Sequence, residues 1–201
     1  MIELYEFAAS GNCHKVRLQL SLLKLPYQSV LVNGAEKQHK SADFLAMNGF
    51  GQVPVLRDGD TVIRDSQAIL VYLARQYGGE QWLPIDAAGL AEVCSWLSSA
   101  ANEVSRGPNA LRLHYKFGRQ LVLADAEQIS HNLLSLLQQQ LQQRPYLCGS
   151  LPNIADIALY PYLALAPEAR LDLQPFPAVR AWLTRIQQLD GYVGMPGMWQ
   201  A

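Results

Sequence analysis

Two short segments carry polar side chains at places where a bound anion could be stabilised. Ser10 and Asn12 stand where a short apolar run gives way to a helical pattern, and Asp65 and Ser66 precede a second helical pattern. Free backbone N–H groups and the helix dipole favour an anion at such a position. The same residue types are also good helix caps. The residues alone therefore leave both a binding role and a capping role open.

The cysteines limit the redox chemistry available to this chain. Thioredoxin-like oxidoreductases place Cys-x-x-Cys at this turn, with the first cysteine as nucleophile. Here that position is Ser10 and only Cys13 remains, so we do not expect a dithiol mechanism. We expect Cys13 to be a packed residue of the first helical turn, with a redox role as the alternative. Cys94 and Cys148 are too scattered for a disulfide framework or a zinc site.

The histidines show no metal-ligand spacing with any acid or cysteine. We therefore predict no metal site and expect these side chains at the surface or at its boundary: His14, His114 and His131.

Composition excludes several further classes of protein. The 201 residues are 50% hydrophobic, and 16 Lys and Arg face 17 Asp and Glu, for a net charge of -1. A polycationic nucleic-acid binder is therefore excluded. No basic leader precedes an apolar core near Met1. The longest apolar stretch, 154–167, is interrupted by Asp156 and Pro161, which leaves it too short to span a membrane. We expect a cytoplasmic protein.

The first part of the chain alternates strand and helix signals. A helix between the first two strands favours a parallel βαβ unit, and Asp58-Gly59 is a strong hairpin signal. The order β-α-β-α-β-β-α predicts a small mixed sheet with helices on both faces, the thioredoxin-like arrangement. The predicted strands are 2–7, 27–32, 53–56 and 61–63, and the predicted helices run from Cys13 to near 25–26, over 41–47 and from 65–66 to 78–79.

The second part of the chain is predicted to be all helical. Leu90, Val93, Leu97 and Ala101 recur at helical spacing. The segment 153–156 reads as a capping box before a very apolar helix. We therefore predict an α/β domain over 1–78, a linker over 79–86 and a helical bundle over 87–201.

This outline and five motifs together resemble the glutathione transferase superfamily, in particular its serine-type theta, phi and zeta classes and their bacterial relatives. The motifs follow the family's order and extend over nearly the whole chain. They are Ser10-Gly11-Asn12-Cys13-His14-Lys15-Val16-Arg17, His39-Lys40-Ser41-Ala42-Asp43-Phe44-Leu45, Gly51-Gln52-Val53-Pro54, Asp65-Ser66-Gln67-Ala68-Ile69 and Asn153-Ile154-Ala155-Asp156.

The resemblance implies that Ser10 donates a hydrogen bond to the sulfur of bound glutathione. Lowering a thiol pKa by about two units requires ~2.7 kcal/mol of preference for the anion. One hydrogen bond to a charged group supplies roughly 1.5–3 kcal/mol and a helix N-terminus about 0.3–1 kcal/mol. One hydroxyl group at a helix start is therefore sufficient. Asn12 is the second candidate donor, with a left-handed turn residue as its alternative role.

The resemblance also implies contacts to the peptide backbone of glutathione. In the family the bond before Pro54 is cis, and the backbone of Val53 then pairs with the cysteinyl unit like an added strand. A trans proline at a strand edge is the alternative. Gln52 is expected to add a backbone or amide contact.

Both ends of glutathione are expected to meet charged or polar groups. Ser66 and the helix N-terminus suit the γ-glutamyl carboxylate, and Asp65 suits the ammonium, although many relatives have the longer Glu there. His39 and Lys40 are expected to bind the glycine carboxylate, with a solvated loop as the alternative.

The second substrate is expected to lie against the segment 102–119. Its polar residues at near-helical spacing suggest electrophiles with an anionic group, or else an exposed face: Asn109, Arg112, Tyr115 and Lys116. Phe50 resembles the aromatic key that some relatives insert into a partner subunit, and a core position in its loop is the alternative.

The function implied is that of a homodimeric glutathione transferase, with glutathione as co-substrate and no prosthetic group. Its thiolate would attack a small electrophile. A glutathione-dependent disulfide or peroxide reductase, in which Asn12 matters more, is one alternative. A binding module without turnover is another.

Overall fold

The first part of the chain folds into a four-stranded sheet with three helices. The computed structural model describes residues 1–200. A short 3-10 turn, Gln38–Lys40, precedes α2, and a π-helical turn, Ala74–Gly78, continues α3. The elements are β1 (Ile2–Glu6), α1 (Gly11–Leu22), β2 (Tyr27–Leu31), α2 (Ala42–Met47), β3 (Val55–Asp58), β4 (Thr61–Arg64) and α3 (Ser66–Leu73).

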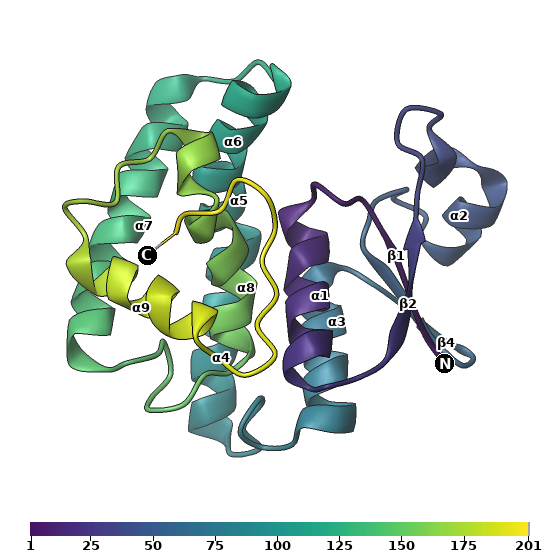
Figure 1. Cartoon of the computed structure of the whole chain (residues 1–201), viewed down its shortest axis with the longest axis horizontal. Coiled ribbons are helices and arrows are strands. Elements are labelled where there is room, and N and C mark those ends of the chain that lie inside the picture. Colours follow the sequence, from purple (N-terminus) through teal and green to yellow (C-terminus); the bar gives the residue numbers. More distant parts are fainter. Residues whose placement is uncertain (201) are drawn as a thin grey trace.

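The sheet has the strand order β2-β1-β3-β4. β1 is parallel to β2, with Ile2 opposite Tyr27, and antiparallel to β3, with Leu4 opposite Leu56. α1 and α3 cover the face that looks toward the helical part, and α2 lies on the other side (Figure 1). The predicted thioredoxin-like arrangement is therefore confirmed.

Several element boundaries differ from the predicted ones. α1 begins at Gly11, two positions before Cys13, because Ser10 caps it. It ends at Leu22, earlier than expected, and Lys24 adopts a positive φ of 55° just beyond it. β3 begins at Val55 because the preceding Pro54 has no N–H to offer to the ladder.

The regular elements of the second part are helices, as predicted. Within residues 87–200 the only β pairing is an isolated bridge between Tyr146 and Gly149. A 3-10 turn, Ala166–Ala169, follows α8. The helices are α4 (Ala87–Ala101), α5 (Glu103–Arg106), α6 (Pro108–Phe117), α7 (Leu123–Gln143), α8 (Ile154–Ala164) and α9 (Pro177–Gln187).

α8 is the central helix of this part, and every one of its residues is buried. The predicted capping box begins it: Asn153 accepts from the backbone of Ala155, and Asp156 accepts from the backbone of Asn153. None of the helices within residues 1–200 is both long and apolar enough to cross a membrane.

One hydrophobic core joins the two parts. Leu18 of α1 and Leu70 of α3 belong to the same buried cluster as Trp82, Leu83 and the residues of α8. The backbone N–H of Ile154 also donates to the carbonyl of Trp82 at 3.2 Å. α8 therefore packs directly against the helices that cover the sheet.

The segment after α9 returns across α1 (Figure 1). Ser21 Oγ donates to the carbonyl of Gly191 at 2.6 Å, and His14 Nε2 donates to the carbonyl of Val193 at 2.9 Å. His14 is fully buried beneath this segment, so its predicted place at the surface or its boundary is wrong. The cause is a partner far away in the sequence, since 179 positions separate His14 and Val193.

Candidate active site

A cleft at the edge of the sheet brings together six residues that the sequence predicts to bind glutathione. We call it the Pro54 cleft. The peptide bond between Val53 and Pro54 is cis, as the resemblance implied. The cleft is lined by Asn12, Asn48, Phe50, Gln52, Val53, Pro54, Arg64, Asp65 and Ser66.

The loop before Pro54 is held by two polar side chains. Asn48 is buried, donates to the carbonyl of Gln52 at 2.8 Å and accepts from the backbone of Phe50 at 3.1 Å. Lys40 Nζ donates to the carbonyls of Phe50 and Gly51, each at 2.9 Å. The ammonium of Lys40 thus supports this loop and does not line the cleft.

His39 also lies outside the Pro54 cleft. Its ring meets the ring of Phe7 edge-on, with centroids 5.4 Å apart. Of the residues predicted for the glycine end of glutathione, neither His39 nor Lys40 lines the cleft, although Lys40 bonds to its rim at Phe50.

The start of α3 presents one free carboxylate oxygen. Asp65 Oδ1 accepts from the backbones of Gln67 and Ala68, at 2.9 and 3.1 Å. Asp65 also has a φ of 73° with a ψ of 129°, outside the left-handed helical region, a conformation that residues other than glycine rarely adopt. Ser66 is buried and donates to Gln67 Oε1 at 2.6 Å. Within residues 1–200, Oδ2 of Asp65 accepts no hydrogen bond and remains available to a cation.

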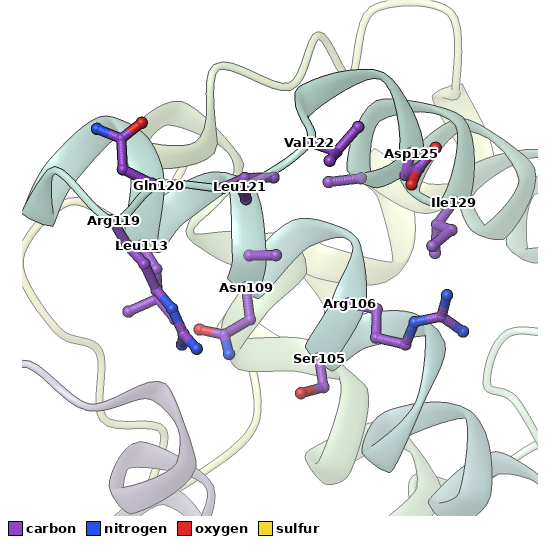
Figure 2. Close-up of a pocket in the computed structure, with 12 residues that line it drawn as sticks. Ser105, Arg106, Asn109, Leu113, Arg119, Gln120, Leu121, Val122, Asp125 and Ile129 are labelled. Atoms are coloured by element: carbon purple, nitrogen blue, oxygen red, sulfur yellow. The ribbon is translucent and has the colours of Figure 1, made fainter.

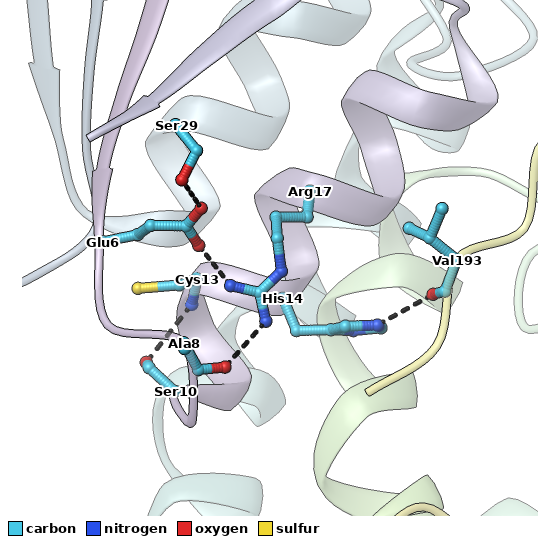
Figure 3. A network of polar contacts seen from close by, with 8 residues as sticks. All are labelled: Glu6, Ala8, Ser10, Cys13, His14, Arg17, Ser29 and Val193. Carbon is cyan, nitrogen blue, oxygen red and sulfur yellow. Dashed lines mark hydrogen bonds and ion pairs between the residues drawn. The ribbon is translucent and has the colours of Figure 1, made fainter. Parts of the chain in front are cut away.

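Ser10 has the capping role, one of the two roles that the sequence left open. Its Oγ accepts from the backbone N–H of Cys13 at 3.3 Å and so caps α1 (Figure 3). A hydroxyl oxygen that accepts one bond still has its own hydrogen to donate. Ser10 lines a second cavity, which we call the Ser10 cavity. It has a volume of about 300 Å³ and is lined by Phe7, Ala9, Ser10, Asn109, Arg112, Leu113, Phe117 and Tyr162.

A buried ion pair fixes the loop that carries Ser10. Glu6 at the end of β1 pairs with Arg17 of α1 and accepts from Ser29 Oγ at 2.6 Å (Figure 3). Arg17 also donates to the carbonyl of Ala8 at 3.1 Å. Since Ala8 lies in the turn between β1 and α1, this network sets the position of Ser10.

Cys13 faces away from both cavities. Its side chain is fully buried, and burial raises the pKa of its thiol to about 11, although a hydrogen bond from Ser10 lowers it in part. A reactive thiol needs the opposite shift. The expectation that Cys13 is a packed residue of the first turn is confirmed.

The residues predicted for the second substrate separate into two groups. Asn109 and Arg112 line the Ser10 cavity, whereas Tyr115 and Lys116 do not. Arg112 is 2% exposed, and its guanidinium donates to Glu168 at 2.6 Å and to the carbonyl of Ala9 at 2.9 Å.

Lys116 also pairs with Glu168. Burial raises the pKa of Glu168, but hydrogen bonds from Lys116 and Arg112 outweigh it and hold the pKa below its ordinary value. The aromatic ring of Tyr115 lies under Arg170, 4.4 Å from its guanidinium carbon. The two cations expected to bind an anionic electrophile are therefore both paired with the single carboxylate of Glu168, which offsets one of their two charges.

A further cavity of about 450 Å³ lies between α5, α6 and α7 (Figure 2). Asn109 and Leu113 line both this cavity and the Ser10 cavity. It therefore adjoins the Ser10 cavity across one turn of α6.

Sequence reasoning missed several residues of the site. Asn48 directly follows the predicted helix over 41–47, and Arg64 belongs to no motif. Phe7 and Phe117 have no polar group that would mark a site. Tyr162 lies within the apolar run of α8, where a polar tip is hard to distinguish from core. All five line one of the two cavities.

Comparisons with known proteins identify the family to which this chain belongs. Residues 4–81 match the family model of the glutathione S-transferase N-terminal domain, and residues 120–185 match that of the C-terminal domain. The chain is 30% identical over 195 residues to glutathione S-transferase GstB of Escherichia coli (strain K12), covering 94% of each chain. It is also 30% identical over 200 residues to a maleylpyruvate isomerase of a Ralstonia species, covering 95% of this chain and 94% of the relative.

The fold also superposes closely on a solved structure. The crystal structure of a glutathione S-transferase from Xanthobacter autotrophicus superposes with a TM-score of 0.90 at 34% identity, covering 98% of both chains. A relative at this identity and coverage shows shared descent as well as a shared fold. The chain belongs to the glutathione S-transferase family.

Proposed function

We propose that this protein is a glutathione transferase in which Ser10 stabilises the thiolate of bound glutathione. The observation that carries the proposal is the position of Ser10, which caps α1 and lines a largely apolar cavity toward which its hydroxyl can rotate. The thiolate would attack a carbon of an electrophile held in the Ser10 cavity. Positioning and pKa lowering then account for the catalysis.

Glutathione would lie along the Pro54 cleft with its backbone paired to Val53. The free Oδ2 of Asp65 suits the γ-glutamyl ammonium, and Ser66 with the N-terminus of α3 suits the carboxylate. Asn12 and Gln52 line the same cleft and are proposed as further donors. His39 and Lys40 remain candidates for the glycine carboxylate from the rim.

The two parts of the chain would bind different substrates. We propose that residues 1–78 bind glutathione, that residues 79–86 link the two parts, and that residues 87–201 contribute the electrophile site. Asn109 and Arg112 are the predicted residues of that side which line the Ser10 cavity. With the charge of Arg112 paired to Glu168, the cavity suits an uncharged electrophile with an apolar body.

The test is a comparison of two reactions in one protein sample. We expect the wild-type protein to conjugate glutathione to a chlorinated nitroaromatic compound and to reduce a glutathione-linked disulfide poorly. Mass spectrometry of the thioether identifies the conjugate. The opposite ratio of rates would favour the disulfide reductase, and failure to bind millimolar glutathione would favour a binding module.

A glutathione-dependent isomerase is the second candidate, favoured by the identity to the Ralstonia enzyme named maleylpyruvate isomerase. Addition of the thiolate to a conjugated double bond, rotation and release of glutathione would isomerise a substrate without consuming glutathione. The glutathione balance separates the two reactions, because conjugation consumes one thiol for each product molecule and isomerisation consumes none.

A further inference from the structure

Tyr162 lies between the Ser10 cavity and a neighbouring space beside Asn12 and Asp65. It lies in α8, is 5% exposed, and lines the Ser10 cavity together with Ser10. It also lines the adjoining space between Asn12, Asp65 and α4–α6. It does not line the Pro54 cleft. Its place is therefore on the electrophile side of the sulfur position.

The ring of Tyr162 is held in one position by α1. A Cβ on Gly11 would come within 2.7 Å of the ring, so glycine is required for this close packing. The ammonium of Lys15 lies 5.6 Å from the ring centroid, within the range of a cation–π contact. A ring fixed in this way holds its hydroxyl at a defined point beside the start of α1.

The hydroxyl of Tyr162 has a hydrogen to donate. Burial raises the pKa of Tyr162 to about 12, while the charge of Arg112 and the backbone N–H of Asn12 lower it only in part. The hydroxyl is therefore protonated at neutral pH. Among residues 1–200 it donates to no carbonyl or side chain, in contrast to Tyr160 on the same helix, which bonds to the hydroxyl of Tyr192 at 2.7 Å.

We propose that Tyr162 is a catalytic residue that donates a hydrogen bond to the carbonyl oxygen of an α,β-unsaturated carbonyl substrate. This inference rests on the proposed function and names its substrate class. The glutathione thiolate forms a bond to the β-carbon, and the π-electron pair moves to place a negative charge on the oxygen. Tyr162 stabilises that enolate, and a proton from solvent then adds to the α-carbon to give the thioether.

Most of the other polar groups of the Ser10 cavity have partners or roles that prevent them from donating to the substrate carbonyl oxygen. Ser10 is assigned to the sulfur, and Arg112 is committed to Glu168 and to the carbonyl of Ala9. Asn109 is the remaining amide, on the facing helix α6. A preorganised donor at the position of a developing oxyanion is the arrangement that accelerates such additions.

The test is Tyr162→Phe, which keeps the ring and removes only the hydroxyl. We expect kcat/KM for a conjugated enone to fall by about 10-fold to 100-fold, the effect of one lost hydrogen bond to a charged acceptor. The rate with a benzyl halide, which develops no charge on oxygen, should change by less than about 2-fold on the same scale. Tyr160→Phe is the matched control on α8 and should leave the ratio of the two rates unchanged.

Three outcomes would overturn the role of Tyr162. Equal losses of rate with both electrophiles would indicate damaged packing. A raised pKa of bound glutathione in Tyr162→Phe would show that the hydroxyl contacts the sulfur and not the carbonyl oxygen. An unchanged enone rate would leave Asn109 or water as the donor. A wild-type protein that conjugates neither electrophile would instead contradict the proposed function, and the role of Tyr162 would fall with it.

Discussion

At the scale of the residue, the proposed function gives the hydroxyl of Ser10 two partners. Its oxygen caps α1 by accepting from Cys13, and we propose that its hydrogen is donated to a glutathione thiolate at the Ser10 cavity. A substitution here changes both helix stability and chemistry. The two effects must therefore be separated by a control that loses a cap only.

We expect Ser10→Ala to raise the pKa of the bound glutathione thiol by about 1–2 units, because one hydrogen bond to the anion is lost. At a pH below the new pKa, kcat should fall more than KM rises. The ultraviolet absorbance of the thiolate, titrated in the binary complex, measures the pKa directly.

Ser41→Ala is the matched control for Ser10→Ala. Ser41 caps α2 by accepting from the backbone of Phe44 at 3.3 Å, the same distance as in the cap of α1, and it lines neither the Pro54 cleft nor the Ser10 cavity. We expect its loss to cost about 1 kcal/mol of stability and to leave the thiol pKa unchanged. An unchanged titration in Ser10→Ala itself would assign the sulfur contact to Asn12.

At the scale of the element, the start of α8 depends on one buried carboxylate. Asp156 accepts from the backbones of Leu147 and Asn153, each at 3.0 Å, and from the indole N–H of Trp182 at 2.8 Å. The side chain thus joins α8 to the preceding loop and to α9. Its role is to satisfy donors that have no access to water.

We predict that Asp156→Ala lowers the free energy of unfolding by roughly 3 kcal/mol or more, because several buried donors lose their acceptor together. Asp86→Ala is the comparison, since Asp86 caps α4 by accepting from the backbone of Gly89 at 2.8 Å in an exposed position. That variant should lose about 1 kcal/mol. Urea denaturation of both variants measures the difference, and equal losses would contradict the role given to Asp156.

The elements also show how far a sequence alone could predict this site. Caps, prolines and glycines act on neighbouring residues, so the positions of Ser10, Pro54 and Asp65 followed from short motifs. The pairing of Arg112 could not be predicted in this way. Its partner Glu168 lies 56 positions away, and only the packed fold brings the guanidinium and the carboxylate together. Tyr162 was missed for the same reason, since only the contact of α8 with α1 brings it beside Ser10.

At the scale of the whole molecule, the segment after α9 forms hydrogen bonds to α1, the first helix of the chain. Burial lowers the pKa of His14 to about 4, and its hydrogen bond to the carbonyl of Val193 offsets that only in part. The folded protein therefore binds a proton at His14 less readily than the unfolded chain does. The stability due to neutral His14 is complete above pH 6.5 and is lost as the pH falls through about 4.

We predict that His14→Gln removes this part of the acid sensitivity. The free energy of unfolding should fall less between pH 7 and pH 5 in the variant than in the wild type, because glutamine does not titrate in this range. Denaturation curves at the two pH values measure the difference. Parallel losses in both proteins would show that His14 does not couple folding to pH.

Phe50 bears on the assembly of the molecule. Its side chain is 63% exposed at the rim of the Pro54 cleft, with Arg64 stacked 4.8 Å from its ring centroid. A core position is therefore wrong, which leaves the predicted role of a key in a homodimer. We expect a dimer by light scattering and a shift toward monomer in Phe50→Ala, with Phe117→Ala, another exposed aromatic side chain, as control. A monomeric wild-type protein would contradict this prediction.

The continuous core between the sheet and α8 restricts how such a chain can change over evolutionary time. Leu18 and Leu70 pack into the same cluster as Trp82 and Leu83, and Gly11 leaves no room for a larger residue beside Tyr162. A recombined gene that joined the first part of this chain to the second part of another protein would bring together core residues that do not fit one another. The two halves are therefore expected to be inherited together, and new specificity should arise from substitutions around the cavities rather than from exchange of halves.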